Sequence, residues 1–497
     1  MKVVSGTTMR QVDAATIAAG LSDQVLMERA GQGATAAIVA FLANFAASHR
    51  RRIVVYAGKG NNGGDGYVIA RCLSEQGYDV ALVASHESSA LTGAAAHHAR
   101  LLPTTVPILT AYSLSPDCVV IDCLLGTGIA GPARVPVSHL IREINEAGCL
   151  VIAIDIASGV NADDGSAAGE AIRADLTVTI GCLKTGLLTG EGAKLRGVLR
   201  LVDIGIDPQA LGVAESAGEA FTAAEAQALL GRLPHGCHKV TTGCVTVFGG
   251  SALYPSAPFL SGEAALRCGA GLVTVAVPTA IPVLPVPRAL IVQQRSGPQT
   301  HRALAEAERA ALTSQDVIAV GPGLTREPEA VGMVQQLLST EIKLVVDADA
   351  LVAISADLLP KQAPWVLTPH AGECARLIER LGGSWPEDRR ELARELSAQT
   401  GAVVVLKGPN TIVAAPDGSV TWNTTGTQAL ATGGTGDILT GMIAGFWAGG
   451  LAAADAARLA TFVHGSVAES AICQRAFIAD DLLAGLAPAL AAISPFA

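Results

Sequence analysis

Short apolar segments alternate with helical patterns along nearly the whole chain, and this alternation constrains the fold more than any other feature. In the first half the apolar segments occupy 52–58, 79–85, 118–124, 149–156 and 176–181, with helix-like segments at 65–77 and 137–148. In the second half they occupy 244–250, 272–278, 316–323, 343–350, 364–370, 402–408 and 411–416. Strands separated by helices form parallel sheets with helices on both faces. The sequence therefore predicts the α/β class for both halves.

A break in this pattern divides the chain. The interval 205–232 is rich in Ala and Glu and has no strand pattern. A chain of 497 residues is also too long for a single ordinary core. We expect a first domain at 1–213, a linker and lead-in helix at 214–232, and a second domain at 233–497.

Net charge and cysteine spacing limit the partners and the compartment. The net charge is −10, which argues against nucleic acid or an anionic membrane as the main partner. The ten cysteines have no CxxC spacing and the N-terminus lacks the apolar core of a signal peptide, which favours a cytoplasmic protein with reduced thiols. The apolar runs 269–287 and 438–454 are interpreted as a buried strand with a loop and as one buried helix. We expect no nucleic-acid partner and no membrane partner.

Several segments of the first half carry polar residues where a predicted strand ends. The segment AGKGNNGGDGYVIA (57–70) follows a strand and opens a helix, so its glycines fit a phosphate loop. Its Asn and Asp oxygens suit a cation or ribose hydroxyls, while a tight turn with Asp65 as helix cap is an equally good interpretation. Asp122 and Asp155 end two further strands before glycine turns, and such loops share one edge of a parallel sheet. Lys184 also follows a strand, but a lone lysine there is more often a surface residue.

Six motifs of this half occur in a characteristic order: MRQVDAATI, LMERAG, GNNGGDG, IDCLLGTG, DIASGVNADDG and TIGCLKTGL. Together they resemble the YjeF N-terminal domain over residues 1 to about 210. Members of that family are NAD(P)H-hydrate epimerases with a Rossmann-like, three-layer fold. The segment DIASG stands where the family usually has DIPSG, which loosens the turn but keeps its Asp, Ser and Gly.

This resemblance implies a set of site residues. Asp155 would bind the substrate and act as the acid–base group, and Asn62, Asp122 and Ser158 would ligate a potassium ion (K⁺). The residues implied to contact the hydrated nicotinamide nucleotide are Asn61, Asn62, Gly63, Gly64, Asp65, Gly126, Thr127, Gly128, Ile129, Ala130, Gly131, Pro132 and Asp155.

Polar residues also end the predicted strands of the second half. They are Asp347 and Asp349 in VDADAL, His370 and Glu373 in LTPHAGE, and Lys407 in LKGPNT. Each alone is more often a turn residue, a helix cap or a solvated strand end, but their density favours a site. The run TGGTGD (432–437) adds glycines whose N–H groups suit an oxyanion, followed by Asp437 at a helix start. A carboxylate there is placed to deprotonate an attacking hydroxyl.

The motifs LTPHAGE, VDADAL, LKGPNT and GGTGD together resemble the YjeF C-terminal domain over about 225–497. That family comprises ribokinase-like NAD(P)H-hydrate dehydratases that depend on ADP or ATP. The resemblance implies Mg²⁺ with the nucleotide and Asp437 as catalytic residue. The implied contacts to the hydrated dinucleotide are Ala257, Gly323, His370 and Asp437, and those to the adenine nucleotide are Lys407, Gly408, Pro409, Asn410, Thr411 and Gly436. Departures from the family pattern are HKVTTG (238–243), YPSA (254–257), and Val352 in DADALV.

The two resemblances together imply a bifunctional repair enzyme for hydrated nicotinamide nucleotides. The first domain would interconvert the R and S forms of NADHX and NADPHX, and the second would dehydrate the S form with ADP or ATP, releasing AMP or ADP and phosphate. The fusion resembles bacterial relatives, which favours ADP, and family members often assemble, which implies a homo-oligomer. The alternative is a ribokinase-class small-molecule kinase whose N-terminal domain is a nucleotide-binding module.

Overall fold

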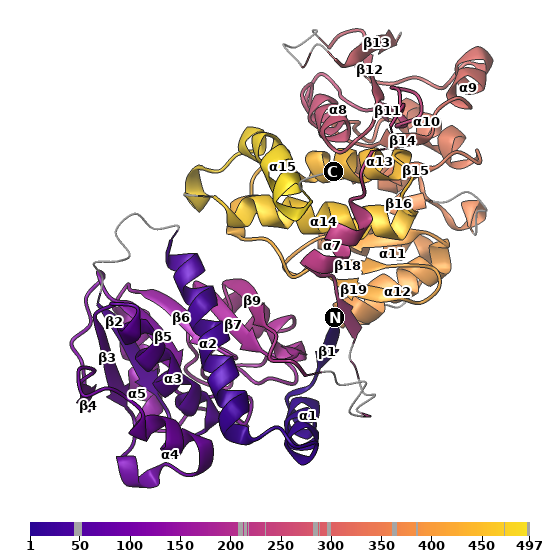
Figure 1. Ribbon diagram of the computed structural model, residues 1–497. Helices are drawn as coiled ribbons and strands as arrows, with labels where there is room; N and C mark the ends of the chain where they lie inside the picture. Colours follow the sequence, from indigo (N-terminus) through magenta and orange to yellow (C-terminus); the bar gives the residue numbers. More distant parts are fainter. Residues whose placement is uncertain are drawn as a thin grey trace. The chain divides into compact units, whose positions relative to one another are not determined.

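The computed structural model describes residues 1–43, 52–206, 212, 216, 218–233, 235–281, 287, 289–295, 300–359, 365–383, 386–471 and 473–494. The chain divides into two compact units, Met1–Ala220 and Phe221–Ala497 (Figure 1). The predicted linker and lead-in helix, 214–232, span this division and include α7 (Ala223–Leu229), which a Thr222–Glu225 capping box begins.

Unit 1 (Met1–Ala220) is built on a parallel sheet. Its strands lie in the order β4 (Ile108–Leu109), β3 (Val80–Ala84), β2 (Ile53–Ala57), β5 (Val119–Cys123), β6 (Leu150–Ile154), β7 (Leu176–Ile180) and β9 (Val198–Val202). Every neighbouring pair in this sheet is parallel. The central strands are wholly buried and rich in β-branched residues, as expected for strands covered on both faces.

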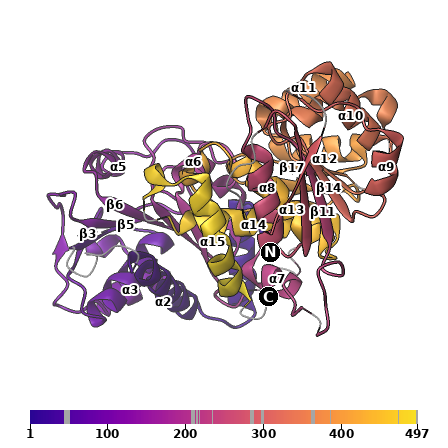
Figure 2. The ribbon, with the colours of Figure 1, turned by 90° about the horizontal axis from the view of Figure 1, so that it is seen from above.

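Helices cover both faces of this sheet. They are α1 (Gly6–Ala18), α2 (Asp23–Leu42), α3 (Asn61–Glu75), α4 (Gly93–Arg100), α5 (Val137–Glu146) and α6 (Gly192–Leu195). Figure 2 shows α5 on the opposite face from α2 and α3. The arrangement is the Rossmann-like three-layer fold that the sequence predicts.

The NNGGD segment lies inside a helix rather than in a loop before one. We predicted a helix from residue 65, but α3 begins at Asn61 with Gly60 as its N-cap. A Cβ at Gly63 would lie 1.7 Å from the carbonyl oxygen of Gly58, so glycine alone lets this first turn pack against the end of β2. Asp65 is consequently in the second turn of α3 and does not cap it.

Three short strands of unit 1 lie apart from its main sheet. β1 (Lys2–Val4) pairs in parallel with β8 (Leu183–Lys184) and in antiparallel with β10 (Gly218–Ala220). The prediction that 205–232 holds no strand is therefore wrong at β10. The sequence GEA has low strand propensity, and its backbone becomes a strand because β1, from the other end of the unit, pairs with it.

Unit 2 (Phe221–Ala497) contains a mixed sheet. Within its described residues the order is β13 (Ile291–Arg295), β12 (Leu272–Pro278), β11 (Cys244–Phe248), β14 (Val317–Val320), β15 (Leu344–Val346), β16 (Trp365–Leu367), β17 (Val403–Leu406), β18 (Ile412–Ala414) and β19 (Val420–Trp422). The strands from β13 to β17 are parallel, whereas β18 and β19 continue as an antiparallel meander. The all-parallel expectation fails there because only five residues separate β17 from β18, which is too short for a crossover.

Two helical layers sandwich this sheet. The helices are α8 (Ala257–Arg267), α9 (Glu306–Leu312), α10 (Pro328–Leu338), α11 (Ala371–Leu381), α12 (Arg389–Thr400), α13 (Thr435–Ala448), α14 (Ala453–Glu469) and α15 (Ala479–Ile493). Figure 2 shows α8 and α13 on one face of the sheet and α9, α10 and α12 on the other.

The apolar run 438–454 forms parts of two helices instead of the single helix that we predicted. α13 ends at Ala448, and α14 begins at Ala453. Gly450 has φ +104°, a left-handed conformation that stops the first helix. Most of α13 is buried against α8, which gives the start of α13 a rigid position in unit 2.

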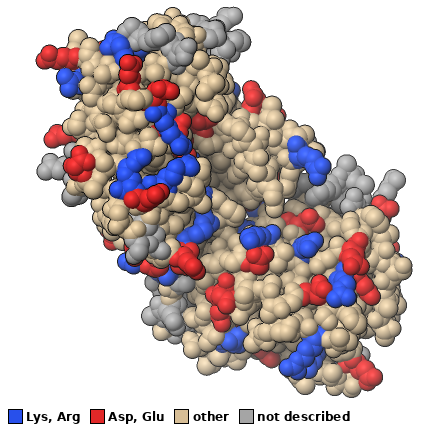
Figure 3. All heavy atoms as spheres, turned by 180° about the vertical axis from the view of Figure 1, so that it is seen from behind, with Lys and Arg blue, Asp and Glu red and all other residues tan. Residues whose placement is uncertain are grey.

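The membrane-spanning potential, the thiols and the surface charge can each be described. None of the helices in the described parts of the chain has the length and apolar character needed to cross a membrane. The ten cysteines are free thiols, and most of them are buried. Basic and acidic side chains are interspersed on the face drawn in Figure 3.

Candidate active sites

The end of β5 in unit 1 carries a network of polar side chains around Asp122. Asp122 is fully buried, and it accepts hydrogen bonds from Ser158 N (2.9 Å), Ser158 Oγ (2.6 Å) and Leu124 N (3.1 Å). Asn62, from α3, donates Nδ2 to the carbonyl oxygen of Leu125 at 2.8 Å. Its Oδ1 is buried and has no hydrogen-bond partner in the described structure. An orphaned amide oxygen beside a buried carboxylate and a hydroxyl is a donor set suited to a hard cation.

Asp155 is held in a strained conformation directly after β6. Its φ is +67°, in the left-handed region that few non-glycine residues occupy. Its carboxylate pairs with the ammonium group of Lys184, which also donates to Ile180 O (2.7 Å) and Thr179 Oγ1 (3.1 Å). The surface interpretation of Lys184 is wrong, because the residue is only 1% exposed. It reaches the same sheet edge as Asp155 because β8, its strand, pairs with β1.

Two more carboxyl groups lie within electrostatic reach of this ion pair. Burial raises the pKa of Asp13, on α1, to about 6; Lys184 opposes the shift and Asp155 adds to it. Burial also raises the pKa of Asp65 well above its usual value, and Asp155 and Asp13 raise it further. Asp13 is a site residue that our sequence reasoning missed. Its only signal was its place in the motif MRQVDAATI.

The predicted loop 126–132 lies beside the Asn62 network. A Cβ at Gly126 would lie 3.2 Å from the Cβ of Asn62, so this glycine allows a close approach. The carbonyl oxygen of Thr127 accepts a hydrogen bond from Arg10 of α1 at 3.0 Å. The structure thus brings together α1, the start of α3 and the loops after β5 and β6 at one edge of the sheet.

Asp347 is the centre of the corresponding network in unit 2. It follows β15, is 1% exposed, and accepts hydrogen bonds of 2.7 Å each from Lys407 Nζ, Thr368 Oγ1 and Thr440 Oγ1. Burial alone would raise the pKa of Asp347, but Lys407 and the hydrogen bonds hold it below its usual value. Asp347 is therefore an ionised anchor for Lys407 and not an ordinary turn residue. Asp349 is separate from this network and pairs with Arg326.

His370 and Glu373 lie next to Lys407. The backbone N–H of Lys407 donates to the carbonyl oxygen of Pro369 at 2.8 Å, and Glu373 Oε2 lies 3.7 Å from Lys407 Nζ. His370 Nδ1 accepts hydrogen bonds from the N–H groups of Gly372 (2.9 Å) and Glu373 (3.3 Å), so the helix-cap interpretation of His370 is confirmed. Because Nδ1 is an acceptor, the proton of the neutral ring is on Nε2, and the half-exposed side chain can donate it to a ligand.

The TGGTGD segment forms the N-terminus of α13 beside Lys407. Gly434 is the N-cap at φ +92°, and a Cβ at Gly436 would lie 3.7 Å from Lys407 Nζ. The backbone of Asp437 is fixed by a 2.7 Å hydrogen bond from Ser261 Oγ to its carbonyl oxygen. Burial raises the pKa of the Asp437 carboxyl to about 7, with a further contribution from Asp347 and an opposing one from Lys407. A carboxyl with this pKa is well matched to a general base at neutral pH.

The remaining predicted residues of unit 2 fall into two places. Ala257 and Gly323 are adjacent, since a Cβ on Gly323 would lie 3.1 Å from the Cβ of Ala257. The segment 408–411 follows Lys407, and Asn410 within it is buried with φ +52°. Arg389, which sequence reasoning missed, donates to the carbonyl oxygens of Leu406, Lys407 and Pro409 and so holds this segment in place.

Unit 2 brings together a helix N-terminus rich in glycine, a lysine, and a carboxyl whose pKa is near neutral, as in enzymes that bind and act on an anionic group. Residues 245–487 match the family described as NAD(P)H-hydrate dehydratase, and residues 23–186 match the family described as YjeF-related protein N-terminus.

Curated relatives extend this match to nearly the whole chain. The bifunctional NAD(P)H-hydrate repair enzyme Nnr of Moorella thermoacetica is 36% identical, over 97% of this chain and 95% of that protein. The enzyme of the same name from Coxiella burnetii is 35% identical, over 95% of this chain and 96% of its own length. The ADP/ATP-dependent NAD(P)H-hydrate dehydratase of Bacillus subtilis, co-crystallised with ATP and Mg²⁺, is 30% identical over 56% of this chain and 99% of that chain, with a TM-score of 0.49. The chain belongs to the family of bifunctional NAD(P)H-hydrate repair enzymes.

We predict that Asp437→Asn stabilises the protein, and more so at high pH. The folded-state pKa of about 7 lies above the model-compound value of 3.8, so the folded chain loses stability as pH rises between these values. The amide removes this cost. The gain in the free energy of unfolding should be about 3 kcal/mol larger at pH 8 than at pH 5. Thermal melting of the unit 2 transition at both pH values measures it, with exposed Asp480→Asn as control; equal gains at both pH values contradict the prediction.

Proposed function

We propose that unit 1 interconverts the R and S hydrates of NADH and NADPH and that unit 2 dehydrates the S hydrate at the expense of a nucleotide. The single observation that carries the proposal is that the glycine-rich start of α13 at Gly436 lies beside Lys407 and carries Asp437, whose carboxyl has a near-neutral pKa. This arrangement combines a helix N-terminus that can bind an anion with a carboxylate that can act as a base. The family membership supports the substrate class.

Dehydration in unit 2 would proceed through a phosphorylated ring. Asp437 takes the proton of the ring hydroxyl, whose oxygen attacks the terminal phosphorus of the nucleotide and displaces AMP or ADP. The C6–O bond then breaks as C5 loses a proton, phosphate leaves, and the 5,6 double bond of the dihydronicotinamide is restored. Phosphorylation is needed because hydroxide is a poor leaving group and phosphate is a good one.

The positions of the loops support separate sites for the two ligands. The residues that would contact the adenine nucleotide are Lys407, Gly408, Pro409, Asn410, Thr411 and Gly436. Those that would contact the hydrate are Ala257, Gly323, His370 and Asp437. Mg²⁺ binds mainly through phosphates and water, with one or two carboxylates. Glu373, which lies near Lys407, is a carboxylate that fits this role and leaves Asp437 free to act as the base. Mg²⁺ would neutralise charge on the transferred phosphoryl group.

Potassium fits the network around Asp122 in unit 1. The unpartnered Oδ1 of Asn62 supports an ion there, with Asp122 and Ser158 as further oxygen ligands. A bound K⁺ would offset the buried charge of Asp122 and hold the loops that carry Asn61–Asp65 and Gly126–Pro132 against the substrate.

Epimerisation needs an acid and a base on the two faces of the ring, because hydroxide must leave C6 and water must return from the other side. Asp155, which pairs with Lys184, is suited to contact the substrate as the base. Asp65 and Asp13, whose pKa values are raised, are suited to supply the proton. Of the carboxyl groups near the Lys184 ammonium, Asp155 would therefore be the base, and Asp13 or Asp65 would be the acid.

We further propose ADP as the preferred donor, a homo-oligomer in the cytoplasm, and functional domains at 1–213 and 233–497. The fused architecture that resembles bacterial members supports the choice of ADP. The division of the chain after Ala220 supports independent domains.

Incubation of the S hydrate with ADP, and separately with ATP, tests the dehydratase activity. We expect the 340 nm absorbance of the dihydronicotinamide to return with one free phosphate per turnover, faster with ADP. Accumulation of a phosphorylated product without recovery of absorbance would instead favour a ribokinase-class kinase.

Replacement of Lys184 tests the epimerase site. We expect Lys184→Met to slow R/S interconversion by about 100-fold, because Asp155 loses the partner that orients its carboxylate. Exposed Lys194→Met is the matched control. Chromatography of the epimers gives the rate, and the dehydration of pure S hydrate should be unchanged in both variants. A Lys184→Met enzyme that epimerises at the normal rate would remove Lys184 from the site.

A further inference from the structure

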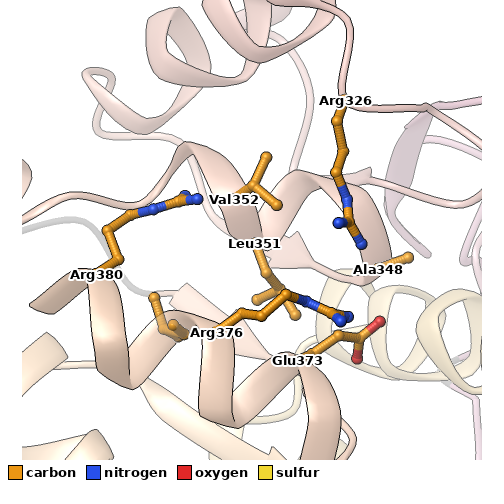
Figure 4. Close-up of a pocket in the computed structure, with 8 residues that line it drawn as sticks. Arg326, Ala348, Leu351, Val352, Glu373, Arg376 and Arg380 are labelled. Carbon is orange, nitrogen blue, oxygen red and sulfur yellow. The ribbon is translucent and has the colours of Figure 1, made fainter.

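A pocket of unit 2 lined by three arginines lies next to the dehydratase residues. Its walls are Arg326, Ala348, Leu351, Val352, Glu373, Arg376, Leu377 and Arg380 (Figure 4). Arg326 comes from the turn after β14, whereas Arg376 and Arg380 are one helical turn apart on α11. In Figure 4 the arginine side chains extend from these separate segments around Leu351 and Val352.

The charges in this pocket are incompletely balanced. Arg326 pairs with Asp349 at 2.7 Å, and the carboxylate of Glu373 is engaged by the N–H of His370 and lies near Lys407. Neither Arg376 nor Arg380 forms an ion pair with any residue that the structure describes. Like charges at positions i and i+4 of a helix repel each other. The two guanidinium groups therefore favour an anionic ligand over an empty pocket.

The side chains that line the pocket favour a phosphate group. Guanidinium groups bind phosphate oxygens in a bidentate manner. Val352 stands where the family resemblance places an Asn, so this wall is apolar and the arginines are the main donors. An apolar wall excludes water and strengthens such contacts.

The position of the pocket favours the hydrated dinucleotide over the adenine nucleotide. Arg326 lies three residues beyond Gly323, and Glu373, three residues beyond His370, binds the backbone of His370. Gly323 and His370 are both on the side that we assign to the hydrate. The segment 407–411, assigned to ADP or ATP, belongs to the connection between β17 and β18 and approaches the pocket at Glu373, whose Oε2 lies 3.7 Å from Lys407 Nζ.

We propose that Arg326, Arg376 and Arg380 form a subsite for a phosphate group of the hydrated dinucleotide. The proposal rests on the dehydratase function assigned to unit 2. Two sources carry this chemistry: the pyrophosphate, present in both NADHX and NADPHX, and the 2′-phosphate, present in NADPHX alone. In either case the subsite binds a phosphate group of the substrate that is remote from the nicotinamide ring, while the ring hydroxyl of the substrate lies at Asp437.

The test is steady-state dehydration by the full-length protein carrying Arg376→Ala together with Arg380→Ala. The KM and kcat for S-NADHX and for S-NADPHX are measured at saturating ADP, and the KM for ADP at saturating hydrate. Arg394→Ala, an exposed arginine of α12, is the matched control. Arg376→Lys with Arg380→Lys keeps the charge but removes the bidentate geometry.

We expect the KM of the alanine variant for a hydrated dinucleotide to rise at least about tenfold, with kcat and the KM for ADP nearly unchanged. A rise for NADPHX alone assigns the 2′-phosphate, and a rise for both substrates assigns the pyrophosphate. The lysine variant should recover part of the loss.

Unchanged KM values for both hydrates would overturn the subsite, and so would a rise confined to the KM for ADP. Either result counts against the subsite only when the wild-type protein restores the 340 nm absorbance from the S hydrate. A wild-type protein that fails to do so contradicts the dehydratase function itself, so the two failures are distinguishable. Thermal melting confirms that the variants fold, as expected for two exposed positions of α11.

Discussion

In each unit a lysine paired with an aspartate lies at the carboxyl edge of the main sheet, and each site depends on its own pair. In unit 1 Lys184 holds Asp155 in its left-handed conformation after β6. In unit 2 Asp347 holds Lys407 beside Gly436, and its charge helps to raise the pKa of Asp437. Removing one partner of such a pair leaves an uncompensated buried charge. The pairs therefore fix both the geometry and the protonation of the groups around them.

The same edge of two related sheets supports different chemistry because different groups surround each pair. Unit 1 places two more carboxyl groups, Asp13 and Asp65, near Lys184, which suits proton transfer to and from a ring. Unit 2 places a helix N-terminus without side chains at Gly434 and Gly436 next to one carboxyl, which suits an anionic phosphoryl group. A damaged nucleotide can thus be epimerised and dehydrated by one chain.

The sequence predicted the elements and site residues that leave local signals. Strand ends followed by glycine or an acid led to Asp122, Asp155, Asp347, Lys407 and Asp437, because a parallel sheet gathers such ends at one edge. Contacts made between distant segments left no such signal. Asp13 reaches the site from α1, Arg389 holds the 406–409 backbone from α12, and Lys184 is buried because its strand pairs with β1. The helix α3 begins earlier than predicted because Gly63 has no Cβ that would collide with the carbonyl oxygen of Gly58, and this close approach is visible only in the folded structure.

An Asp437→Asn variant of the full-length protein shows whether one chain holds two separate active sites. Both activities are followed in one sample: 340 nm absorbance with S hydrate and ADP, and the R/S ratio by chromatography. We expect dehydration to be abolished while the epimers interconvert at the wild-type rate. Dehydration that persists in this variant would contradict the assignment of Asp437, and loss of both activities would contradict separate sites.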